Sequence, residues 1–259
     1  LFPKARPQQI QYAEMLLKRK LYSEAAPLAK LLDDPQSPNR ILSSVILLDE
    51  LETGIIPEFE ISHAIRSFPD DPAILEIAAA NALAQKDFEK ALRFALQNLR
   101  TGNTSSDILF QLFAAYDGLG KTDEAVATLQ KLRSRSDVNP TAVFKMFSLY
   151  CIRNGRFREL QSLHTELSAG FIPEAKILQP LLEAEIACRK NNPKKAIALI
   201  QESLASSEWK FDDPDELEFL YQMAVLLTRA GDYPSAIQLY GRIYPLYQGK
   251  ALIQVKLSE

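Results

Sequence analysis

Apolar residues recur along most of the chain at every third or fourth position, the spacing of one face of an α-helix. Alternating strand patterns are hard to find, and glycine is scarce, with 9 in 259 residues. The helical segments are short and come in pairs, such as residues 72–85 with 87–100, 106–120 with 122–134, and 215–231 with 233–247. Because short connections join antiparallel neighbours, the pattern predicts an all-α fold of antiparallel helix pairs.

A small residue near the start of each second helix reveals an internal repeat. Successive copies of this residue are separated by 32, 34, 34, 35, 36 and 40 positions. Two helices approach closely only where side chains are small, and one pair cannot cover its own apolar face, so neighbouring pairs must stack into a solenoid. The aligned residues are Ala25, Pro57, Ala91, Ala125, Leu160, Ala196 and Ala236. We expect Ala91 and Ala236 to be buried, opposite Ala79 and Ala224 of their first helices.

The period of 34 residues resembles that of the tetratricopeptide repeat family. Further signals are a helix-ending glycine at Gly120, Gly155 and Gly231, and the segment FPDDP between two units. The family's tryptophan is absent, and Phe113 and Leu160 fill positions that are usually small. The resemblance implies one domain over residues 1–259, a right-handed superhelical solenoid of seven degenerate units. Their expected limits are 6–37, 38–71, 72–105, 106–140, 141–176, 177–213 and 214–249, followed by a C-terminal segment 250–259.

The segment Gly120-Lys121-Thr122 matches the end of a phosphate-binding P-loop. That motif requires another glycine at the position of Ala115 and a strand before it, whereas a helical pattern precedes this segment. We therefore expect Gly120 to end one helix in a left-handed conformation and Thr122 to cap the next.

Other residues that could carry chemistry have structural interpretations. The acidic segments LLDDP, FPDDP and FDDPDELE each lie beside a proline, where aspartate is expected to cap the following helix. His63 and His164 lie three units apart, which argues against a shared metal site or catalytic dyad, and Cys151 and Cys188 have the apolar flanks of buried thiols. The sequence predicts no catalytic, metal-binding or cofactor-binding residues.

Composition narrows the classes of partner. A net charge of -3 and a pI near 5.6 give no overall attraction to nucleic acid or to an anionic membrane. No apolar run approaches the ~20 residues that span a bilayer. The compartment stays open between the cytoplasm and, if a signal peptide was removed before Leu1, the periplasm or another extracytoplasmic space.

By the resemblance, the first helices line a concave surface that binds a peptide or helix of a partner protein. Family members that clamp a C-terminal carboxylate place Lys, Asn and Arg there, whereas here the asparagines are missing and Lys145, Arg153, Arg189 and Arg229 are the basic residues. A largely apolar groove is therefore predicted. Its expected residues are Phe110, Ala114, Leu149, Ile152, Lys145, Leu83 and Tyr221.

Three alternatives stay open. The apolar stripe could be core rather than groove. Trp209, the single tryptophan, could cover the seam between the last two units or anchor a partner. The chain could be a structural subunit of a larger envelope or secretion assembly, with self-association, or, more remotely, an all-α hydrolase using inward carboxylates such as Glu76 and Asp117.

Overall fold

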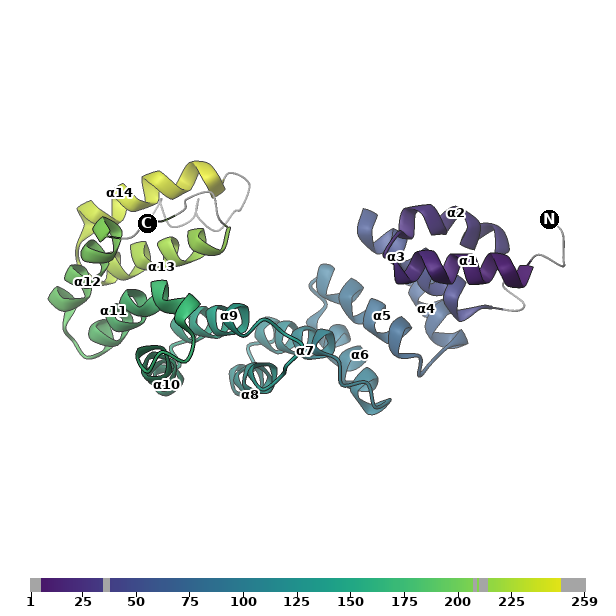
Figure 1. The fold of residues 1–259 in the computed structure, drawn as a ribbon, viewed down its shortest axis with the longest axis horizontal. Helices are drawn as coiled ribbons and strands as arrows, with labels where there is room; N and C mark the ends of the chain where they lie inside the picture. Colours follow the sequence, from purple (N-terminus) through teal and green to yellow (C-terminus); the bar gives the residue numbers. More distant parts are fainter. Residues whose placement is uncertain (1–5, 35–37, 207–208, 210–213, 248–259) are drawn as a thin grey trace. The chain divides into compact units, whose positions relative to one another are not determined.

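The computed structural model describes residues 6–34, 38–206, 209 and 214–247, and Figure 1 shows them as a succession of helices. These residues form fourteen α-helices and two short 3₁₀ helices, and no strand occurs among them. The predicted all-α helical-repeat fold is thereby confirmed. The bounds are α1 Arg6–Lys18, α2 Tyr22–Leu32, α3 Arg40–Thr53, α4 Glu58–Ser67, α5 Pro72–Ala84, α6 Phe88–Arg100, α7 Ser106–Gly118, α8 Thr122–Arg133, α9 Pro140–Arg153, α10 Phe157–Ser168, η2 Pro173–Leu178, α11 Gln179–Arg189, α12 Pro193–Ser206, α13 Pro214–Ala230, α14 Tyr233–Ile243 and η3 Tyr244–Tyr247.

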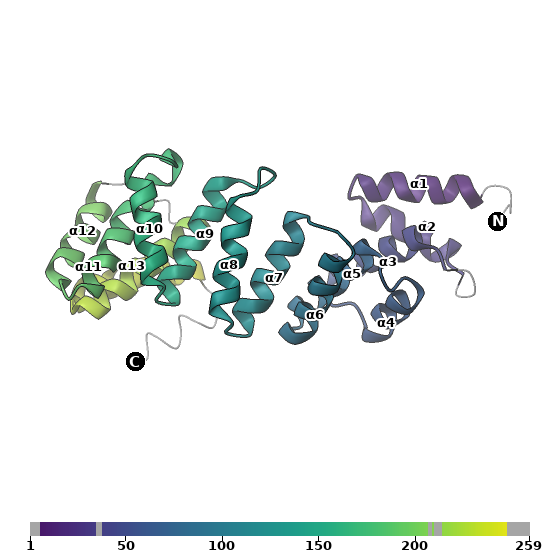
Figure 2. The ribbon, with the colours of Figure 1, turned by 90° about the horizontal axis from the view of Figure 1, so that it is seen from below.

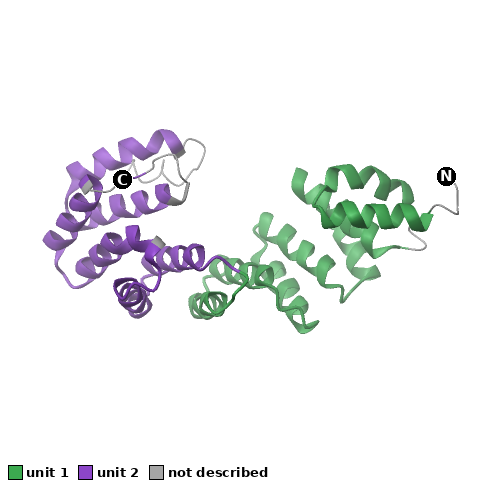
Figure 3. Cartoon of the chain, in the orientation of Figure 1, with its two compact units in different colours: residues 1–137 green, residues 138–259 purple. Residues whose placement is uncertain are grey.

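The helices group into two compact units, residues 1–137 and residues 138–259 (Figure 3). Unit 1 contains α1 to α8, and unit 2 contains α9 to α14. Within each unit a helix packs against the next one, and the first helices of successive pairs also touch, as α5 does with α7 and α11 with α13. Figure 2 shows α11 and α13 of unit 2 side by side. The single domain and its seven repeat limits stay a prediction.

The turn inside a helix pair has one repeated geometry. Its central residue has a left-handed backbone, and the next residue donates its N–H to a carbonyl five positions earlier, as Asp87 does to Ala82 at 2.9 Å and Lys121 does to Tyr116 at 2.9 Å. This is the Schellman ending of an α-helix. The left-handed residues are Lys20, Lys86, Gly120, Gly155, Asn191 and Gly231.

Gly120, with φ of +66°, ends α7 as predicted. The predicted capping role of Thr122 is wrong by one position. Lys121 is the N-cap of α8, with no side-chain cap, and Thr122 is the first helical residue. The turn takes two residues before α8 begins, the left-handed Gly120 and then Lys121. Thr122 is therefore the first residue of α8 and not its cap.

Side chains of Asn, Asp or Ser start several first helices. The Oδ1 of Asp71, in FPDDP, accepts from the backbone N–H groups of Ala73 and Ile74 at 3.0 Å each, with Pro72 in the first turn, as predicted. Asp33, in LLDDP, instead lies at the C-terminal end of α2. Asp212 and Asp213 of FDDPDELE lie outside the described residues. The other caps are Asn39 for α3, Ser105 for α7 and Asn139 for α9.

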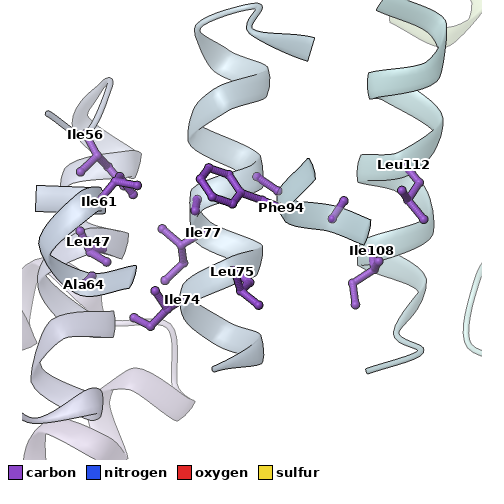
Figure 4. Close-up of a cluster of buried hydrophobic side chains, with 13 residues drawn as sticks. Leu47, Ile56, Ile61, Ala64, Ile74, Leu75, Ile77, Phe94, Ile108 and Leu112 are labelled. Atoms are coloured by element: carbon purple, nitrogen blue, oxygen red, sulfur yellow. The ribbon is translucent and has the colours of Figure 1, made fainter. Parts of the chain in front are cut away.

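The core of unit 1 is a layer of apolar side chains between consecutive helices. Its largest cluster runs from Leu47 in α3 to Leu112 in α7, and Figure 4 shows Ile74 and Ile77 of α5 near its centre. Burial of Ala91 and Ala236, 0% and 1% exposed, is confirmed.

The helix register of the third pair differs slightly from the expectation. Ala91 clusters with Ala82 of α5 and Ala115 of α7, whereas Ala79 belongs to the larger cluster. The small side chains that surround Ala91 therefore lie one helical turn further along α5 than predicted.

The second pair departs from the repeat. Pro57, aligned with the small residues of other second helices, is only the N-cap of α4, and four residues, 54–57, connect α3 to it. Ile56 in this connection is 0% exposed. Its N–H donates to Oδ1 of Asn81 at 2.9 Å, and its carbonyl accepts from Nδ2 of Asn81 at 3.1 Å. The connection is thereby fixed to α5 by one buried amide side chain.

Candidate functional site

A pocket of about 310 Å³ lies between α9 and α13, the first helices of the first and third pairs of unit 2. We call it the α9–α13 pocket. Met146 and Leu149 of α9 and Phe219 of α13 form its apolar wall. Its volume accommodates one or two apolar side chains of a partner. The remaining lining residues are Ala142, Lys145, Arg153 and Glu218.

The rim of the α9–α13 pocket is charged. Lys145 Nζ lies 5.9 Å from the centroid of the buried Phe219 ring, within the range of a cation–π interaction. Arg153 is exposed at the C-terminal end of α9, where its charge complements the helix dipole. Glu218 supplies one carboxylate and accepts a hydrogen bond from Gln222 at 3.0 Å. An apolar wall with two cations and one anion suits an apolar side chain flanked by acidic residues.

A buried carboxylate links two first helices of unit 2, α11 and α13, near their C-terminal ends. Glu185 of α11 is 0% exposed. Its Oε1 accepts from Arg189 Nε at 2.5 Å, and its Oε2 accepts from Arg229 Nη1 at 2.9 Å. A buried carboxylate is stable only when it is paired and hydrogen-bonded, so the two guanidinium groups are held in defined positions.

Sequence reasoning missed Glu185, although a signal was present. Arg153, Arg189 and Arg229 are spaced by 36 and 40 residues, the repeat spacings of Leu160, Ala196 and Ala236. The three arginines therefore occupy one repeat position, at or near the C-terminal ends of α9, α11 and α13. Beside them, burial raises the pKa of the half-buried Cys188 thiol above its ordinary value.

The predicted groove residues fall into both units. Lys145 and Leu149 line the α9–α13 pocket together. Ile152 is buried, with 5% exposed, and contributes to the core. Tyr221 is half-buried, and its ring centroid lies 5.9 Å from that of Tyr240 in α14. In unit 1, the half-buried residues Leu83, Phe110 and Ala114 lie on first helices α5 and α7.

Trp209 is packed into unit 2. Its side chain is 8% exposed, and its indole N–H donates to the carbonyl oxygen of Ser203 near the end of α12 at 3.2 Å. A partner anchor needs an exposed ring, whereas the ring of Trp209 is packed in this structure.

A second hollow of unit 2, about 490 Å³, lies between α10, α11 and α12 and contains His164. His164 Nε2 is 3.2 Å from Glu183 Oε1, and Gln179 donates to the same oxygen at 2.9 Å. Burial raises the pKa of Glu183, but these two hydrogen bonds and electrostatic attraction to His164 and Lys195 together hold the pKa below its usual range. His63, in contrast, lines a pocket of unit 1.

That pocket of unit 1, about 660 Å³, lies between the end of α2 and helices α3 and α4. Glu50 and Glu60 both line it. Burial, together with hydrogen bonding to and repulsion by the Glu60 carboxyl group, raises the pKa of Glu50 to about 7. Lys30 Nζ, 3.9 Å from Glu50 Oε1, lowers the pKa by less than these effects raise it.

Because the pKa of Glu50 is raised, we expect the stability of the folded protein to fall as pH rises. The pKa of Glu50 is higher in the folded than in the unfolded chain, so its contribution is fully present below about pH 4.5 and is lost as pH rises through about 7. We expect Glu50→Gln to reduce the loss of thermal stability between pH 5 and 8 by about 2–6 °C, measured as Tm at several pH values. Equal pH profiles for the variant and the wild type would contradict this assignment.

Two further features of the described part of the chain concern metal ions and membranes. Among these residues no group of three or more His, Cys, Asp or Glu side chains is placed to hold a metal ion. None of the helices that the structure describes combines the length and the apolar character needed to cross a membrane.

Comparisons with known proteins support the repeat assignment. A family model described as tetratricopeptide repeat matches residues 181–251. A tetratricopeptide repeat protein from Parabacteroides merdae is similar in structure, with a TM-score of 0.64, 14% identity and 98% of both chains covered. MamA AMB-1 matches with a TM-score of 0.53 and 16% identity, covering 64% of this chain and 96% of that one. No curated protein matches the sequence. The repeat signature thus lies at residues 181–251, and a tetratricopeptide repeat protein shares the fold of almost the whole chain.

Proposed function

We propose that this protein is a non-catalytic scaffold that binds a peptide or helix of a partner protein, and that the α9–α13 pocket receives the partner's main apolar side chain. The observation that carries the proposal is the pocket itself, where the half-buried Leu149 and Met146 face Phe219. Repeat proteins of this kind bind extended partners on surfaces built from successive repeats.

The charges at the pocket rim favour a particular partner chemistry. Lys145 and Arg153 stand beside the apolar wall, and Glu218 is the one acidic lining residue. Arginine pairs well with carboxylates because its planar guanidinium group can donate two parallel hydrogen bonds. The preferred segment therefore carries a large apolar side chain with an acidic residue close to it.

The first helices of unit 1 supply a separate candidate binding surface. Phe110, Ala114 and Leu83 are half-buried, so each combines packing with exposed apolar area. Such residues suit an apolar stretch of partner outside the pocket.

The test uses the full 259-residue chain to select binding peptides of roughly twelve residues from a random library. The affinity of the selected peptides is then measured for the wild type and for variants of the chain. Leu149→Glu should weaken binding at least about tenfold, or ~1.4 kcal/mol, while helical circular dichroism stays unchanged. Arg153→Glu should weaken the acidic peptides selectively. Arg158→Glu, an exposed arginine on the second helix α10, is the matched control and should leave binding unchanged.

Two results would overturn the proposal. Selected peptides that bind Leu149→Glu as tightly as the wild type would place recognition elsewhere. Loss of helical signal in Leu149→Glu would show that Leu149 is a core residue, since a half-exposed groove residue tolerates a charge. For unit 1, the corresponding variant is Phe110→Glu, with peptide binding and helical circular dichroism measured in the same way.

A further inference from the structure

Successive helix pairs in this protein stack through a defined set of positions, most clearly between α6 and α7. Leu112 and Ala115 of α7 are 4% and 0% exposed and cluster with side chains of α6. On α6, Leu92 packs against the cluster that contains Ala115. Phe88 lies against Gly118, where a Cβ atom would overlap the Phe88 ring. Helix α6 thus presents two apolar side chains, four residues apart, to the next first helix.

The last second helix, α14, repeats this apolar face with no described helix beyond it. Ala236 aligns with Ala91, so Tyr233 and Ile237 occupy the positions of Phe88 and Leu92. Their exposed fractions are 60% and 67%. Gly241, one further turn along, is open, since a Cβ there meets no described atom within 4 Å.

The first helix of the chain has the complementary face. Ala13 aligns with Phe113, so Tyr12 and Met15 occupy the positions of Leu112 and Ala115. Tyr12 is 52% exposed and Met15 is 37% exposed. At the same two positions, α9 has Phe147 and Tyr150, each 1% exposed, and α13 has Met223 and Leu226, each 0% exposed. The positions that α7, α9 and α13 bury are therefore apolar and uncovered on α1.

We propose that the α14 face of one copy, Tyr233 and Ile237, binds the α1 face of a second copy, Tyr12 and Met15. The contact follows the order of α6 on α7, because one face belongs to a second helix and the other to a first helix in the repeat register, with Lys18 on α1 where α7 has Gly118. Terminal helices of repeat proteins are normally polar on the outside, and here both terminal faces carry large apolar side chains.

The two faces differ, so the contact is heterologous and generates open chains or closed rings of copies. Each face is the width of one helix, so the contact buries less surface than the roughly 1,200–2,000 Å² of a stable interface. Association is therefore weak and depends on concentration. The contact is independent of partner binding in the α9–α13 pocket, whose residues it does not use.

Sedimentation of the full chain from about 5 to about 500 µM tests the contact. The average mass should rise above the 29.1 kDa of one chain. Tyr12→Glu with Met15→Glu, or Tyr233→Glu with Ile237→Glu, should each lower the association constant at least about tenfold. Phe171→Glu, which changes an apolar residue that is 76% exposed and belongs to neither α1 nor α14, should leave the association unchanged.

A mixture of the two double variants provides the sharper test. One retains an intact α14 face and the other an intact α1 face, so the mixture should stop at a two-chain species of about 58 kDa, twice 29.1 kDa. A wild-type mass that stays at 29.1 kDa, or a mixture that remains monomeric, would overturn the proposal.

Discussion

Replacing Asn81 with leucine should lower the free energy of unfolding by about 2–5 kcal/mol, the largest effect that we expect from a single substitution in unit 1. Asn81 is 3% exposed, and its amide group satisfies both the N–H and the carbonyl of Ile56, which is 0% exposed. Leucine is similar in size but has no polar atoms. Both backbone groups would then stay buried without a partner, at about 1–3 kcal/mol each.

The measurement is thermal or denaturant unfolding of the full chain, and the expected fall in Tm is about 5–15 °C. Asn154→Leu is the matched control. Asn154 is exposed at the end of α9, and its amide bonds only to the carbonyl of Tyr150 in the preceding turn. That change should cost less than about 1 kcal/mol. Similar losses for both variants would show that the connection at Ile56 does not depend on Asn81.

The helix pairs and their stacking could be predicted from sequence because both follow from local rules. Residues 72–85 and 87–100 were expected as a pair, and α5 and α6 begin and end within one residue of those limits. Apolar periodicity identifies the buried face of each helix, and a short polar connection identifies the turn. Small residues such as Ala91 identify where two helices approach closely.

Only some of the left-handed turn residues could be predicted from the sequence. Gly120, Gly155 and Gly231 indicated left-handed turns, but Lys86 and Asn191 adopt the same conformation with φ near +58°. A left-handed backbone costs a non-glycine residue on the order of 1 kcal/mol, which the packing of two helices readily outweighs. The conformational preference of each residue type therefore predicts the turns at glycine but not the turns at Lys86 and Asn191.

The second pair and the candidate site depended on contacts that the repeat register does not contain. Pro57 aligned with the small residues of other pairs, yet Ile56 is buried by Asn81 from the next pair. In the candidate site, Leu149 and Ile152 share a predicted helix face, but one lines the pocket and the other is core. Periodicity gives the direction of a side chain, whereas its depth depends on which neighbouring helix covers it.

Changing Gly118 to alanine should destabilise the protein by about 1–3 kcal/mol, although alanine is the better helix former by about 1 kcal/mol. Gly118 is the last residue of α7, and a Cβ atom there would overlap the ring of Phe88 at the start of α6, including the ring carbon nearest its backbone. That carbon cannot move away without a change of rotamer or a shift of the helix, so the overlap is not relieved cheaply.

The matched control for Gly118→Ala is Gly241→Ala in α14, where a Cβ meets no described atom within 4 Å. This change should stabilise the protein by about 0.5–1 kcal/mol through helix propensity alone. Opposite signs of the change in Tm for two identical substitutions would establish that α6 and α7 are in close contact at Phe88. Phe88→Leu in the Gly118→Ala background should recover part of the loss, because the smaller side chain removes the overlap. A gain in Tm for Gly118→Ala would show instead that the Phe88 ring turns aside freely, and the stacking contact between these helices would then rest on Leu92, Leu112 and Ala115.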